Sequence, residues 1–61
     1  MEGDAIYFAR RAKEERDAAL TAPHPSARQA HLEMADRYDK LAAAIAIQER
    51  RLAIKAVGAA A

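Results

Sequence analysis

The sequence predicts an all-α fold, an antiparallel helical hairpin with a short first helix and a long second one. Apolar residues recur at steps of three and four, which is the period of a helix and not of a strand. Ala, the best helix former, is abundant, and only Pro23 and Pro25 interrupt the helical pattern. Because a short connection makes neighbouring helices antiparallel, we expect one domain with helices at about 5–21 and 26–57, a turn at 22–25 and a flexible tail at 58–61.

The first helix is expected to begin after Asp4, a good N-cap residue, and to end before the two prolines. Arg10 and Glu14 lie four residues apart, as do Lys13 and Asp17, so two ion pairs should support this helix. Its expected contact face is mostly alanine, and Ile6 and Tyr7 fall outside that face. The residues of the face are Ala5, Phe8, Ala9, Ala12, Arg16, Ala19 and Leu20.

The second helix has signals at both ends. Ser26 and Gln29 form a capping-box pattern, in which the serine accepts from free backbone amides of the first turn. Gly58 can adopt the left-handed conformation that often ends a helix, and the cations before it suit the negative end of the helix dipole. A helix from Ser26 to Val57 would be about 48 Å long.

The contact face of the second helix follows alternating steps of four and three, which is typical of a coiled-coil-like seam. Antiparallel pairing through the short turn would place Leu20 against Ala27, and Phe8 near Tyr38 and Leu41. The N-terminal end of the first helix would then lie opposite about residue 42. The predicted seam consists of Ala27, His31, Met34, Tyr38, Leu41, Ile45, Gln48, Leu52 and Lys55.

The second helix therefore outreaches the first by roughly fifteen residues, about 22 Å of helix. This region is apolar on two sides, and a helix of that kind is normally buried on two sides. We expect the chain to form a homodimer through this region and the Ile6/Tyr7 edge, giving a four-helix bundle. The expected function is that of a small interaction or adaptor protein that binds another protein. The predicted interface residues are Ile6, Tyr7, Ala43, Ile45, Ile47, Gln48, Leu52, Ile54 and Val57.

The residues that could carry chemistry favour structural roles. His31 lies on the seam, where we expect it to donate to a carboxylate such as Glu15 or Glu14, and His24 in the turn should be exposed. Paired carboxylates need a cleft to act as acid and base, and the acidic residues here repeat along a solvated helix face. The chain has no Cys and only two Gly. We therefore expect no enzyme activity, no catalytic residue, no metal site and no cofactor.

The charges indicate two other possible partners, nucleic acid and an anionic membrane surface. The basic run that begins at Arg10 and Arg11 is interleaved with acids, whereas nucleic-acid binders gather cations on one face. Arg50, Arg51 and Lys55 could instead make a basic amphipathic helix for an anionic membrane surface. A small nucleic-acid-associated regulator and a membrane-surface helix thus remain alternatives. The N-terminus does not read as a signal peptide, and we expect a cytoplasmic protein.

The run YFARRAKEERDAA, the proline-marked turn and SARQAHLEMADRYDKLA resemble short uncharacterised helical-hairpin proteins of alphaproteobacteria. The resemblance covers about residues 5 to 42. It implies a small bacterial, cytoplasmic protein and carries no activity across. The recurring pattern is A-R-x-A-H-x-x-M-A-x-x-Y, here Ala27, Arg28, Ala30, His31, Met34, Ala35 and Tyr38.

Overall fold

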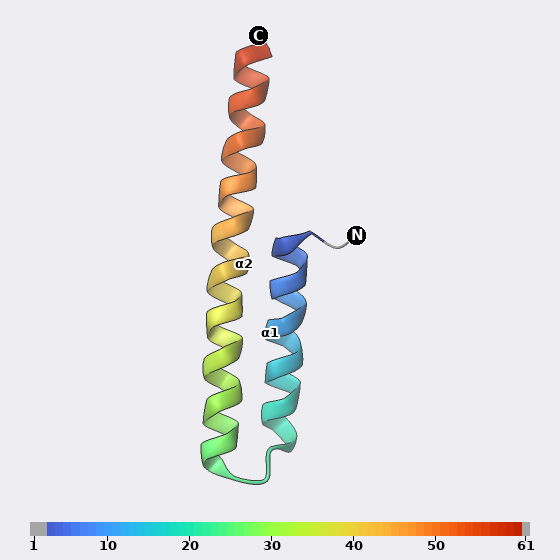
Figure 1. Cartoon of the computed structure of the whole chain (residues 1–61), viewed down its shortest axis with the longest axis vertical. Coiled ribbons are helices and arrows are strands. Elements are labelled where there is room, and N and C mark those ends of the chain that lie inside the picture. The colour runs from blue at the N-terminus through green and yellow to red at the C-terminus, as the bar shows by residue number, and fades with distance from the viewer. Residues whose placement is uncertain (1–2, 61) are drawn as a thin grey trace.

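Two helices packed side by side make up the fold (Figure 1). The computed structural model describes residues 3–60, without the side chains of residues 59 and 60. Helix α1 spans Asp4–Thr21 with 18 residues, and helix α2 spans Pro25–Ala60 with 36 residues. They form the antiparallel all-helical hairpin expected from the sequence, and its long dimension is 56 Å.

The helix starts differ slightly from the expected ones. Helix α1 begins at Asp4 with Gly3 as its N-cap, and the Tyr7 amide donates to the Gly3 carbonyl at 2.8 Å. Helix α2 begins at Pro25, so the prediction that Ser26 caps it is wrong. Proline fits the first helical position because the amide it lacks would have no helical partner there. Gln29 donates to the Glu33 carboxylate at 3.2 Å instead of completing a capping box.

The expected end of α2 at Val57 is also wrong, because the helix continues through Gly58 to Ala60. Gly58 does not adopt a positive φ. The alanines on both sides of Gly58 favour helix, and they offset the cost of about 1 kcal/mol that a glycine adds within a helix. The expected flexible tail is thus helical over 58–60, and residue 61 lies outside the described residues.

Small residues form the contact between the helices. Ala12, Ala19 and Ala35 are buried, and their short side chains let the two backbones approach closely. Nearer the N-terminus of α1, the rings of Phe8 and Tyr38 stack with centroids 5.8 Å apart. The predicted proximity of Phe8 to Tyr38 is confirmed, and it fixes the register of the hairpin.

The orientation of α1 about its axis differs from the expected one. Leu20 is 83% exposed and Leu41 is also exposed, so neither belongs to the contact. Ala9 and Arg16 are exposed too, whereas Glu15 is buried against α2. In this orientation the side chains of Ala12, Ala19 and Glu15 lie against α2. The Glu15 carboxylate has two hydrogen-bond partners, which are described below.

Helix α1 has half as many residues as α2, and it begins beside the midpoint of α2 (Figure 1). Residues 43–60 of α2 therefore extend beyond α1, and we call this segment the overhang. The difference in helix length expected from the sequence is present. It leaves the overhang without a neighbouring helix within the described part of the chain.

Candidate protein-interaction surface

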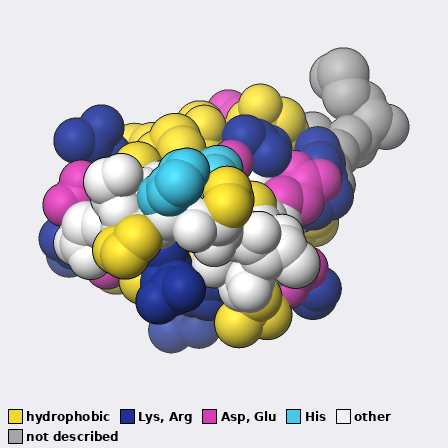
Figure 2. Space-filling view, turned by 90° about the horizontal axis from the view of Figure 1, so that it is seen from below, with side chains coloured by type: hydrophobic (Ala, Val, Ile, Leu, Met, Phe, Trp, Pro, Cys, Tyr) yellow, Lys and Arg dark blue, Asp and Glu magenta, His cyan; other side chains and the backbone are white. Residues whose placement is uncertain are grey.

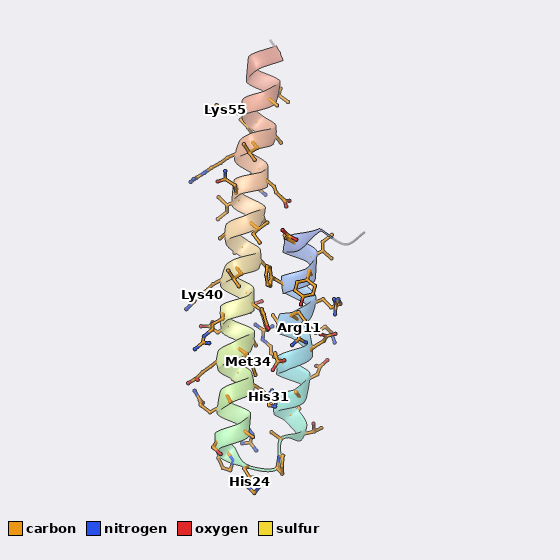
Figure 3. All side chains as sticks on the ribbon, viewed as in Figure 1. Arg11, His24, His31, Met34, Lys40 and Lys55 are labelled. Carbon is orange, nitrogen blue, oxygen red and sulfur yellow. The ribbon has the colours of Figure 1, made fainter. Side chains whose placement is uncertain are left out.

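A polar cluster joins the two helices of the hairpin. The Glu15 carboxylate lies 2.7 Å from His31 Nδ1 and 2.9 Å from Arg11 Nη2 (Figure 3). Because a carboxylate only accepts, Nδ1 carries the proton in this contact. Arg11 also donates to Glu14 at 2.6 Å, and its guanidinium lies 5.3 Å from the Tyr38 ring centroid. The predicted contact of His31 with Glu15 is confirmed, and the cluster fixes how the helices align.

The cluster keeps its carboxylates ionised. The hydrogen bond from His31, helped by the Arg11 guanidinium, holds the pKa of Glu15 below its ordinary value although burial opposes this. Arg11 and then Arg10 lower the pKa of Glu14 by the same mechanism. The pKa of Arg11 is raised in return, mainly by the hydrogen bond to Glu14. Each charge is thus matched by a neighbour, which is typical of a structural ion-pair network.

Other ion pairs lie on the outside of the hairpin. The predicted pairs of Arg10 with Glu14 and of Lys13 with Asp17 are confirmed at 2.9 and 3.0 Å. Within α2, Asp36 and Lys40 pair at 3.0 Å. Arg16 and Asp39 form a second ionic link between the helices. His24 in the turn is exposed, as expected.

The overhang carries the largest concentration of exposed apolar side chains. Its large apolar residues Ile47, Leu52, Ile54 and Val57 are between 52% and 71% exposed. Ala43 and Gln48 are exposed as well, and Ile45, next to the N-terminal end of α1, is half-buried. The predicted interface residues of α2 thus lie mostly in solvent, as a surface available for binding must.

These side chains occupy two faces of the overhang. Leu52 lies seven residues from Ile45 and continues the stripe that contacts α1, because seven residues make about two helical turns. Ile47 and Ile54 are also seven residues apart, and they lie on nearly the opposite face. One added helix can cover only one of these faces. A partner helix must therefore pack either on the face of Leu52 or on the face of Ile47 and Ile54.

The edge formed by Ile6 and Tyr7 is exposed, as expected. The Tyr7 ring lies edge-on against Phe8, with centroids 5.1 Å apart, and below the Arg10 guanidinium at 5.3 Å. These contacts hold Tyr7 in place on α1. Ile47 and Ile54 lie in the overhang, beyond the N-terminal end of α1 that carries this edge.

Sequence reasoning missed a shallow apolar groove beside the turn. It lies between α1 and α2, with Leu20 and Leu32 as its large apolar side chains. Both leucines are exposed. Leu32 falls outside the predicted seam, and this apolar residue off the seam was the available signal, whereas Leu20 was assigned to the contact face. The groove is lined by Arg16, Asp17, Ala19, Leu20, Arg28 and Leu32.

Three further observations concern metal binding, membrane spanning and surface charge. Over this part of the chain, no three His, Cys, Asp or Glu side chains are close enough to share a metal ion. Neither helix, as far as it is described, contains a stretch long and apolar enough to cross a membrane. The closed end of the hairpin shows cations, carboxylates and apolar side chains interspersed (Figure 2). A surface mixed in this way is unlike the one-sided basic face of a nucleic-acid binder.

In comparisons with known proteins, neither the family models nor the curated proteins nor the solved structures give a match to this chain. The resemblance to short alphaproteobacterial helical proteins therefore stays a prediction.

Proposed function

We propose that this protein is a small non-enzymatic protein–protein interaction module, and that it acts by self-association through its overhang. The observation that carries the proposal is the exposed apolar surface of Ile47, Leu52, Ile54 and Val57, in the part of α2 beyond the reach of α1. Two hairpins would combine into an arrangement of four helices, which is the usual way for a chain of this size to enlarge its core.

The energetics favour a partner. Burying a large aliphatic side chain that is now in water contributes about 1.5–3 kcal/mol. The overhang presents four such side chains at more than half exposure. A helix half of which lacks a neighbour is itself marginal in water, because most helical stability in proteins comes from packing. A second helix along the overhang would supply both the apolar burial and the packing that stabilises the helix. A cytoplasmic location remains a prediction.

Analytical ultracentrifugation of the intact protein from micromolar to millimolar concentration tests the proposal. We expect a monomer–dimer equilibrium for the wild type and a monomer for the double variant Ile47→Lys plus Ile54→Lys, because a lysine charge cannot be buried without a partner. A wild type that stays monomeric at millimolar concentration, with its helical circular dichroism intact, would contradict it.

The same samples address the two alternative classes. Binding of duplex DNA that weakens steeply with added salt would favour a nucleic-acid-associated regulator. An increase in helicity on adding anionic phospholipid vesicles, without dimer formation in their absence, would favour a membrane-surface helix. We expect neither change.

A further inference from the structure

The surface of the single chain favours one arrangement of the proposed dimer, and this inference rests on the proposed function. We infer that the partner is a second copy whose α2 lies antiparallel to the first, centred at Ala43, so that each overhang docks into the Leu20/Leu32 groove of the other copy. Three helices would then lie side by side at every level: α1, the first half of α2, and the overhang of the partner.

The first support is one continuous face along α2, which we call the dimer face. Apart from the adjacent pair Ala46 and Ile47, its members follow one another at steps of three or four, the spacing that keeps residues on one side of a helix. The centre of the face lies about a third of a turn around α2 from the stripe that contacts α1, and Ile47 and Ile54 lie at the edge farthest from that stripe. It contains Leu32, Asp36, Asp39, Ala43, Ala46, Ile47, Arg50, Ile54 and Val57.

The dimer face is complementary to itself when two copies run antiparallel. Residues equally distant from Ala43 on either side then meet across the interface, so Leu32 meets Ile54 of the second copy. Ala43 meets its own counterpart, and an alanine at the crossing point lets the two helices approach closely. Ile54 and Ala43 are thus covered by apolar side chains, whereas Ile47 meets Asp39, which already pairs with Arg16 of α1.

Charge selects the antiparallel direction. On the dimer face, the first half of α2 carries Asp36 and Asp39, and the overhang carries Arg50. Antiparallel pairing sets Asp36, which also pairs with Lys40 of its own helix, opposite Arg50 twice by symmetry. Parallel pairing in register sets each against its own kind. Within the described part of the chain, Arg50 has no carboxylate partner, so an incoming aspartate would meet a cation that is not yet paired.

The groove beside the turn further supports this arrangement. In this arrangement the last turns of one overhang reach the closed end of the other hairpin. Ile54 and Val57 would there contact the exposed Leu20 and Leu32, which line the groove. The arrangement therefore covers apolar side chains at both ends of the dimer face, including two that the hairpin alone leaves in solvent.

A competing dimer would pair the two overhangs alone, through Ile45 and Leu52, as an end-to-end extension of each hairpin. It would leave the groove empty and would place Leu52 near the crossing point in place of Ala43. The two arrangements thus assign opposite roles to Ala43 and Leu52, both of which are exposed in the single chain.

Disulfide trapping separates the two arrangements, since the chain contains no cysteine of its own. We expect Ala43→Cys to form an intermolecular disulfide rapidly under mild oxidation, because the two residues 43 face each other at close range. Leu52→Cys is the matched control and should cross-link at the slow rate of random collision. The reverse result, with Leu52→Cys fast and Ala43→Cys slow, overturns our arrangement while leaving self-association through the overhang in place.

Lysine substitutions test the same arrangement without a cross-link. Ile54→Lys should weaken dimerisation roughly a hundredfold or more, and Leu52→Lys, at a similarly exposed position, should leave it nearly unchanged. Reversing one charge, in Asp36→Lys or Arg50→Asp, should weaken the dimer by about tenfold, and combining both reversals should restore it. A double reversal no better than either single one contradicts the predicted pairing.

The outcomes keep the two proposals distinguishable. If Leu52→Lys gives a monomer and Ile54→Lys does not, the antiparallel arrangement is wrong and the overhang remains the binding surface. If both lysine variants dimerise like the wild type, or if the wild type is monomeric at millimolar concentration, the proposed function fails together with the arrangement.

Discussion

The two halves of α2 belong to one continuous helix, yet their surroundings differ completely. In the first half Ala35 is buried and His31 pairs with Glu15 of α1. In the second half Ile54 and Val57 are in solvent although they are more apolar than most residues of the first half. The comparison teaches that burial here follows from where α1 begins and ends, and that the overhang resembles one side of an interface whose other side is another molecule.

The largest expected effect concerns the aromatic anchor that packs α1 against the first half of α2. Phe8→Ala removes the ring that stacks on Tyr38 and should reduce the free energy of unfolding by about 2 kcal/mol, because Phe8 is half-buried. Ile6→Ala is the matched control on the exposed side of α1 and should change it by less than about 0.5 kcal/mol. Urea denaturation at one low protein concentration measures both, and equal losses would contradict the assigned contact face.

Overpacking gives the next largest effect. Ala12 is fully buried between the helices, so Ala12→Leu should force them apart and cost about 1–2 kcal/mol of unfolding free energy. Ala53 in the overhang is exposed, and Ala53→Leu should be neutral within about 0.5 kcal/mol. Thermal unfolding followed by circular dichroism compares the pair. An Ala12→Leu variant as stable as the wild type would mean that the helices lie farther apart than described.

The pH dependence of the unfolding free energy should come from the part of the hairpin where α1 packs against α2. Because the pKa of Glu15 is lowered by His31 and Arg11, the unfolded chain takes up a proton at this group at higher pH than the folded one. The stabilisation is therefore fully present above the ordinary glutamate pKa of about 4.3 and is lost as the pH falls through the lower folded value. We expect Glu15→Gln to flatten this acid limb of stability against pH. A variant that loses stability in acid as steeply as the wild type would speak against the cluster.

The smallest expected effect compares a paired and an unpaired cation. Lys13→Ala removes the ion pair with Asp17 and should cost about 0.3 kcal/mol, since both side chains are well exposed. Lys55→Ala removes an overhang cation that has no acidic partner within the described residues. It should have a smaller effect still. Salt titration of both variants checks the difference, because added salt screens the Lys13 pair.

The sequence predicted those features of the fold that depend on length and register. The proline-marked turn sets the antiparallel pairing, and this alone brought Phe8 to Tyr38 and His31 to Glu15 in the predicted hairpin. The exposed overhang followed from counting residues on each side of the turn. These features depend on the backbone path, which two prolines and the helical period constrain strongly.

The features that could not be predicted depend on rotation about the helix axes. A helix rich in alanine offers several possible contact stripes, and Leu20 made the wrong one look more apolar. The observed stripe includes Glu15, whose carboxylate pairs with His31, beside the short side chains of Ala12 and Ala19. The predicted helix end near Gly58 was wrong for a different reason. A glycine permits a helix to end, and the neighbouring alanines favour its continuation. Leu32 and the groove beside it became visible only once the rotation of both helices was known.

Amide hydrogen exchange along α2, measured at low and at high protein concentration, tests the central claim most directly. We predict that amides of residues 43–60 exchange quickly in the dilute protein and become protected as concentration rises, while those of the first half are protected at both concentrations. Protection of the overhang that is the same at every concentration, whether high or absent, would contradict the claim that a second copy covers it.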